Sequence, residues 1–178
     1  MNVFIRLQFI LSLLICMTCA KTYASQGTMQ RSMDTSAAIA AIRAAYKNIN
    51  TASLTTEVFK YESDGCAYDG QVKYFFNQKK EIVKIVESGS IGDGSWTREF
   101  YFQAGKFIFC YESLVGGPAD GPETRSEYRT YAKDNQVLRF MEDKNIAPAG
   151  EKSADALKVS YKLIKAYTTK KFAEALCE

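Results

Sequence analysis

The residues that could carry chemistry in this chain are carboxylates, tyrosines and cysteines, because its 178 residues include no histidine. Without histidine the usual Ser–His and Cys–His pairs cannot form, and the ordinary zinc sites lack their ligands. Hydrolysis would then have to rest on two carboxylates acting together. The acidic side chains in or near the glycine-rich stretches are Asp93, Glu99, Asp120 and Glu123. Nothing in their spacing pairs any two of them, so the sequence predicts no catalytic residue, no metal ligand and no cofactor.

Three cysteines lie beyond the N-terminal leader, and an exported chain can keep disulfides. Cys66 lies in a glycine-flanked turn, and Cys110 lies in an aromatic run typical of a strand. We expect these two to be bridged. The alternative is that Cys110 is a small buried apolar residue. Cys177, the penultimate residue, is then expected to be the unpaired cysteine.

Aromatic residues are unusually dense after Trp96. Six of them fall within twelve positions, namely Phe100, Tyr101, Phe102, Phe107, Phe109 and Tyr111. Alternation with period 2 places some of these on each face of a sheet. On one interpretation they are core and Trp96 closes its end. On the other, a sheet face stays open and a small apolar ligand or a protein partner contacts it; the contact residues would be Trp96, Phe100, Tyr101 and Phe102.

The first 24 residues have the features of a secretory signal peptide. Arg6 precedes an apolar run, and the step Thr22-Tyr23-Ala24 fits the small-x-small cleavage rule. We therefore expect cleavage between Ala24 and Ser25. The run is about half the ~20 residues that cross a bilayer, so a permanent membrane span is not expected. The sequence predicts an exported protein, periplasmic or secreted.

Two further features bear on the predicted localisation and partners. Cys16 and Cys19 lack the small preceding residue of lipidated cysteines in bacterial lipoproteins, so a lipoprotein is the less favoured alternative. The mature chain would have a net charge of about +1, whereas nucleic-acid binders carry a strong basic excess. We expect no nucleic-acid partner.

The elements that must position these residues follow from periodicity. After a flexible leader at 25–34, a single domain spans 35–178. It begins with a helix whose apolar face includes Ile42, Tyr46 and Ile49, and it ends with a helix over about 153–176. We expect that last helix to bury Leu157, Tyr161, Ile164 and Phe172. Strands are predicted at 53–62, 70–77, 81–88, 95–103, 106–114, 124–132 and 136–142.

These elements predict an α+β fold: an antiparallel meander sheet of six to seven strands flanked by an N-terminal and a C-terminal helix. Both helices are expected on one sheet face, with a closed barrel as the alternative. An internal repeat supports the meander, since three segments share an aromatic strand, a polar turn and a returning apolar strand. In that repeat Phe76, Phe102 and Tyr131 are expected to be equivalent, 26 and 29 residues apart.

The segment Glu99-Phe-Tyr-Phe-Gln-Ala-Gly-Lys-Phe-Ile-Phe109 resembles a hairpin found in small exported bacterial proteins without an assigned function. The stretch from Arg125 to Phe140 is similar to the next hairpin of that group, and the resemblance covers about residues 68–142. It implies a curved antiparallel sheet with a helix and implies no activity.

Two classes of function remain. The first is an exported, non-catalytic binding or interaction protein that uses an aromatic sheet face. The second is an enzyme of the cell envelope that uses carboxylates or tyrosines. The absence of any nucleophile–base pair favours the first class. A pocket with two facing carboxylates would favour the second, and a shallow aromatic groove would favour the first.

Overall fold

The computed structural model describes residues 35–118 and 120–177. The expected signal peptide, the cleavage step between Ala24 and Ser25, and the leader at 25–34 lie outside the described residues. The chain divides at Ala41 into two compact units, and the unit that begins there contains the whole sheet. A helix occupies residues 35–51, and its turns from residue 41 onward belong to this unit.

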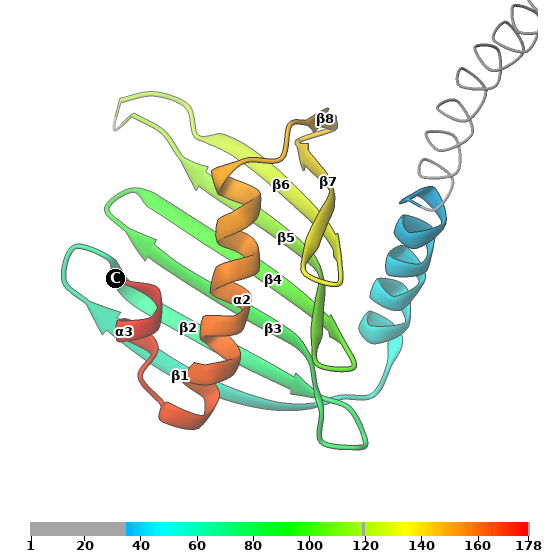
Figure 1. Ribbon diagram of the computed structural model, residues 1–178. Helices are drawn as coiled ribbons and strands as arrows, with labels where there is room; N and C mark the ends of the chain where they lie inside the picture. The colour runs from blue at the N-terminus through cyan, green and yellow to red at the C-terminus, as the bar shows by residue number, and fades with distance from the viewer. Residues whose placement is uncertain (1–34, 119, 178) are drawn as a thin grey trace, which may run out of the picture. The chain divides into compact units, whose positions relative to one another are not determined.

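Eight strands form one antiparallel sheet in the order of the chain (Figure 1). Their bounds are β1 Thr55–Ser63, β2 Ala67–Phe76, β3 Ile82–Ile91, β4 Gly94–Gln103, β5 Lys106–Gly116, β6 Thr124–Lys133, β7 Gln136–Glu142 and β8 Asn145–Ala147. The α+β meander is thereby confirmed, and the short β8 raises the strand count above the expected six to seven. Because β1 and β8 are the two edges, the sheet is open and not the closed barrel of the alternative prediction.

The same shift of strand register occurs in three hairpins, and it shows which residues of the internal repeat are equivalent. The register shifts between Phe75 and Phe76 in β2, between Tyr101 and Phe102 in β4, and between Tyr131 and Ala132 in β6. The residues that follow each bulge are buried in one core: Phe76, Phe102 and Ala132. The expected match of Tyr131 was therefore wrong by one residue, because aromatic identity aligned side chains that point to opposite faces.

The turns of two hairpins explain why each strand pairs with the next strand along the chain. Ala104 and Gly105 both have positive φ, as do Asp134 and Asn135. Two consecutive positive φ values match the tight turns whose twist suits a two-residue hairpin. The sequence thus favours consecutive antiparallel pairing over longer connections.

The C-terminal segment forms two helices, α2 Glu151–Thr169 and α3 Phe172–Leu176, where a single helix was expected. Lys170 separates them in the left-handed conformation, with φ of 58°. Figure 1 shows α2 crossing one face of the sheet, hereafter the α2 face. Its buried positions are mostly small: Ser153, Ala156, Val159, Ser160, Leu163 and Ala166.

The predicted face of this helix was only partly right. Phe172 is buried, but Leu157, Tyr161 and Ile164 are half-buried on the flanks. The reason is that large sheet side chains, among them Tyr74, Phe100 and Phe107, fill the space under α2. The helix therefore meets them with alanine and serine, which lets it lie close to the sheet.

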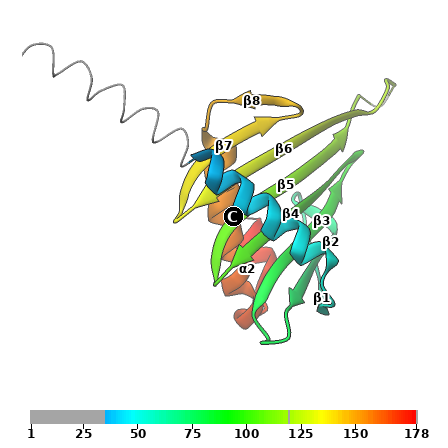
Figure 2. The same ribbon diagram turned by 90° about the vertical axis from the view of Figure 1, so that its right-hand side faces the viewer.

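The first helix packs on the other face, hereafter the outer face. The Tyr46 ring lies 4.9 Å from that of Tyr101 and 5.5 Å from that of Phe109. Their neighbours Phe100 and Cys110 belong to the core beneath α2, so alternation puts Tyr101 and Phe109 on the opposite side. Figure 2 shows the cyan turns of this helix in front of the sheet. The expectation that both helices share one face was wrong. Both faces of β4 and β5 carry aromatic side chains, and a helix on each face removes them from water.

Candidate functional site

A groove of about 470 Å³ opens on the outer face. One wall is the helix, which supplies Ile42, Arg43 and Tyr46, and the floor comes from three central strands. The floor residues are Glu99 of β4, Phe109 and Tyr111 of β5, and Arg129 and Tyr131 of β6. This volume lies within the range of pockets that hold small molecules.

Strand register arranges the floor in two adjacent rows. In one row Glu99 is opposite Tyr111, and Tyr111 is opposite Arg129. In the next row Phe109 lies between Tyr101 and Tyr131. Two strand spacings separate the acidic and the basic end of the first row, about 10 Å. The groove therefore has an aromatic row beneath the helix and a charged row beside it.

The aromatic row is rigidly packed. The Phe109 ring lies 4.9 Å from the Tyr131 ring and 5.7 Å from the Tyr101 ring. Tyr101 is fully buried, and its hydroxyl donates to Glu99 Oε2 at 2.5 Å. Tyr46 is 40% exposed and so forms the open lip of the groove. An apolar ligand would meet preformed rings at small cost in side-chain entropy.

The charged row is held by neighbouring residues. Arg129 donates to Glu127 Oε2 at 2.5 Å and to the Asp143 carbonyl at 2.6 Å, and its guanidinium lies 5.2 Å from the Tyr111 ring centre. At the other end, Lys84 pairs with Glu99 at 2.8 Å. Both charges lining this row are thus compensated within the sheet.

The contacts in and beside the charged row shift the pKa values of Tyr111 and Glu127. Burial, and then the hydrogen bond donated to Glu127, raise the pKa of the Tyr111 phenol. The same hydrogen bond, followed by that from Arg129, lowers the pKa of Glu127. At neutral pH Tyr111 is therefore a neutral donor and Glu127 an anion. Neither group is set up as a general base or a nucleophile, which would need the opposite shifts.

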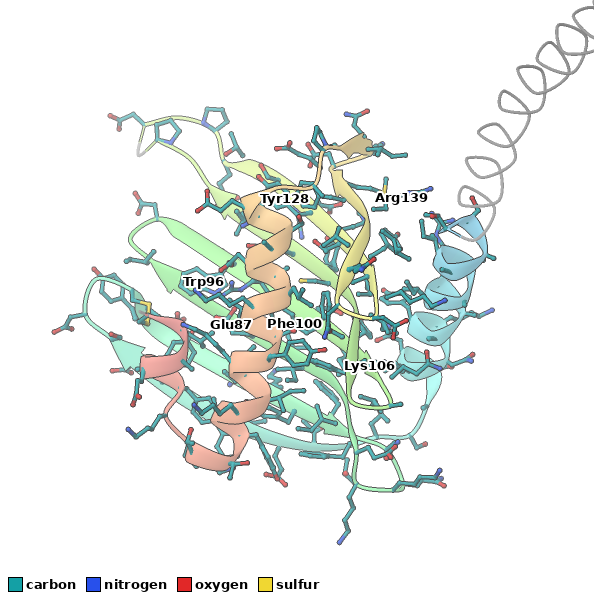
Figure 3. The ribbon with its side chains drawn as sticks, in the orientation of Figure 1. Glu87, Trp96, Phe100, Lys106, Tyr128 and Arg139 are labelled. Atoms are coloured by element: carbon teal, nitrogen blue, oxygen red, sulfur yellow. A yellow bond between two sulfur atoms is a disulfide. The ribbon has the colours of Figure 1, made fainter. Side chains whose placement is uncertain are left out.

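The residues expected to contact a ligand are divided between the two faces. Tyr101 lies under the groove, but Phe100 and Phe102 are at most 1% exposed in the core beneath α2. Trp96 packs on that same core, and Figure 3 shows it beside Glu87. In this structure those three side chains do not reach the open face.

Aromatic density in the sequence marks the central strands and does not indicate the other elements that line the groove. Arg43 and Tyr46 come from the preceding helix, and Arg129 comes from β6. The alternation Glu127, Arg129 and Tyr131 is a signal that could have found the β6 contribution. Nothing local in the sequence indicates that the helix crosses these particular strands.

Beneath α2, a buried polar cluster surrounds Glu87, which is fully buried. The Tyr61 phenol and the Trp96 indole both donate to its Oε1 at 2.6 Å. Arg98 Nε donates to Oε2 at 2.7 Å. Burial, and then the charge of Glu87, raise the pKa of Tyr61. None of these four side chains lines the groove, and each donor reaches an oxygen of the carboxylate, so the cluster is a satisfied structural network.

The disulfide joins Cys66 to Cys177, and the expected Cys66–Cys110 bridge is wrong. Cys110 is free and buried in the central strand β5, whereas Cys66 lies in the turn between β1 and β2. The C-terminal helix α3 returns the chain to this edge, where Phe172 stacks on Phe59 at 5.1 Å. The Cα atoms of Cys66 and Cys177 are therefore only 5.8 Å apart, which fits a bridge.

Among residues 35–118 and 120–177, no three acidic, cysteine or histidine side chains are grouped to hold a metal ion. No helix within those ranges is both long and apolar enough to cross a membrane. Compared with known proteins, the chain matches no family model, no curated protein and no solved structure.

Proposed function

We propose that this chain is an exported, non-catalytic binding protein that holds a small, largely apolar ligand in the groove on its outer face. The observation that carries the proposal is the groove itself, about 470 Å³ in volume, with four aromatic rings among its eight lining residues. Aromatic lining with a few placed polar groups is the usual composition of a ligand site.

The ring positions support binding in particular. The floor rings of Phe109 and Tyr131 are at most 7% exposed and are fixed by neighbours, while Tyr46 at the lip is 40% exposed. A ligand that packs against the exposed side of Tyr46 would bury that ring and remove apolar surface from water, at about 25 cal/mol per Å². A non-catalytic role fits the same lining, because Glu99 is its single carboxylate and is already paired with Lys84.

Export is supported by the disulfide. A bridge between Cys66 and Cys177 persists in oxidising compartments and is rarely kept in a reducing cytosol. The apolar run and the Ala24–Ser25 step point in the same direction. An enzyme that uses carboxylates remains the second class of function, and the feature that would favour it is a second carboxylate facing Glu99 across the groove.

The proposal is tested by titrating the protein with N-phenyl-1-naphthylamine, an uncharged dye that fluoresces in apolar sites. We expect saturable binding with one site per chain. Replacement of Tyr46 by Ser should weaken it about fivefold or more, because the lip ring is lost. The matched control is Tyr68→Ser, at an exposed tyrosine of β2 that does not line the groove. Absence of binding to the wild-type protein, or equal affinities of the two variants, would reject the groove as a ligand site.

A further inference from the structure

We infer that the ligand of this groove is an organic anion with an apolar body, and that Arg43 pairs with its charged group. The inference rests on the proposed function, because it concerns the same groove. It follows from the balance of charges around the lining and from the place of Arg43 on its wall.

Every other charged residue of the lining is matched within the protein. Glu99 pairs with Lys84 at 2.8 Å, and Arg129 pairs with Glu127 at 2.5 Å. The charges of these four groups therefore cancel. Arg43 is exposed on the helix wall and has no ion-pair partner among the described residues. Its guanidinium lies 5.9 Å from the centre of the Tyr131 ring, so it stands over the aromatic row.

The guanidinium of Arg129 is a second group that favours an anionic ligand. Arg129 uses one terminal nitrogen on the Asp143 carbonyl and the other on Glu127, and a guanidinium has five N–H groups in all. It is therefore a fixed cation on the floor with donors to spare, facing a groove whose net charge is one positive unit. An uncharged ligand would leave Arg43 without a partner, and a cationic ligand would be repelled by it.

The aromatic rings of the groove determine the kind of uncharged group that the ligand carries beside its anion. The four aromatic residues that line the same groove as Arg43 are Tyr46, Phe109, Tyr111 and Tyr131. A flat or apolar body can stack on these rings while a carboxylate, sulfonate or phosphate points toward Arg43. The chemical class is thus an aromatic or aliphatic acid of small-molecule size.

Two dyes that differ only in the anion test this directly. 1-Anilinonaphthalene-8-sulfonate is N-phenyl-1-naphthylamine with a sulfonate group added. An ion pair at an exposed arginine is worth a factor of up to about five in affinity, so the wild-type protein should bind the sulfonate about two- to fivefold more tightly than the uncharged dye. The difference should shrink as salt rises from low to physiological concentration.

In the variant Arg43→Gln the ratio of the two affinities should fall to about one, so the preference for the sulfonate is lost. Lys47→Gln is the matched control, because Lys47 is an exposed cation one turn further along the same helix and outside the lining. Equal binding of the two dyes to the wild-type protein, or a sulfonate preference that survives in Arg43→Gln, would overturn the inference and leave the groove as a site for neutral ligands. Failure of the uncharged dye to bind the wild-type protein would instead reject the proposed function.

Discussion

Tyr61 and Trp96 reach the same carboxylate oxygen from opposite sides, each donating to Glu87 Oε1 at 2.6 Å. Tyr61 lies opposite Gly70 in the pairing of β1 with β2, and Trp96 lies opposite Gly89 in the pairing of β3 with β4. Each ring covers the glycine of its partner strand. The two glycines thus provide the space in which both rings turn toward Glu87.

Glu87→Gln should lower the free energy of unfolding by about 3–5 kcal/mol. All three neighbours of this carboxylate are donors, so the amide group would face a donor, and Arg98 would keep only its longer ion pair to the half-exposed Asp155, at 3.6 Å. Urea unfolding measures the loss. The control Glu142→Gln changes an exposed carboxylate of β7 and should cost less than about 0.5 kcal/mol. Equal costs at the two positions would contradict the role of the cluster.

Gly89→Ala should destabilise the protein by about 1–3 kcal/mol through overpacking. A Cβ at this position would lie 2.6 Å from Cζ2 of Trp96, so the indole would have to move away from Glu87. Trp96 is the single tryptophan, so its fluorescence reports that movement. Gly116→Ala is the control, since its nearest neighbour is 3.8 Å away. An unchanged emission spectrum in Gly89→Ala would show that the ring does not depend on the glycine.

The Cys66–Cys177 bridge should be found by peptide mapping without reduction, with Cys110 recovered as a free thiol. The bridge spans 111 positions, for which the chain-entropy model gives about 5 kcal/mol of stabilisation. Cys177→Ser should lose much of this and free α3 from the β1–β2 edge. Linked peptides of Cys66 and Cys110 would refute this pairing.

Stability should fall above about pH 10 because of buried phenols. Burial raises the pKa of Tyr101, as does its hydrogen bond to Glu99. A raised folded-state pKa means that the stabilisation is complete below the unfolded value near 10 and is lost as pH rises beyond it. Tyr101→Phe should therefore flatten the decline measured by urea unfolding between pH 8 and pH 11. The exposed Tyr68→Phe should leave the slope as it is; the same slope in both variants would argue against a buried phenol.

Much of the fold was predictable because its signals are local. Period-2 alternation and glycine or asparagine turns placed seven strands within a few residues of their observed bounds, and tight turns impose a meander. The short β8 was missed because its three residues carry no alternation to detect. The break between α2 and α3 was missed because Lys170 adopts a left-handed conformation that glycine or asparagine usually signals.

The site was less predictable because it depends on which face each helix covers. Aromatic density correctly marked β4 and β5, but alternation alone cannot tell the open face from the face under α2. Tyr101 and Phe100 are neighbours in sequence and lie on opposite sides of the sheet. The disulfide depends likewise on where the C-terminal helix returns, and the distance along the chain carries no information about that.

The most direct test of the ligand groove is a map of backbone amide shifts during titration with 1-anilinonaphthalene-8-sulfonate. The proposed groove predicts shifts concentrated at residues 42–46 and in β4, β5 and β6 around Glu99, Tyr111 and Arg129, the residues that line it. It predicts little change in β1 and α3, at the far edge of the sheet. Shifts centred on α2 or α3, or no saturable shifts at all, would contradict it.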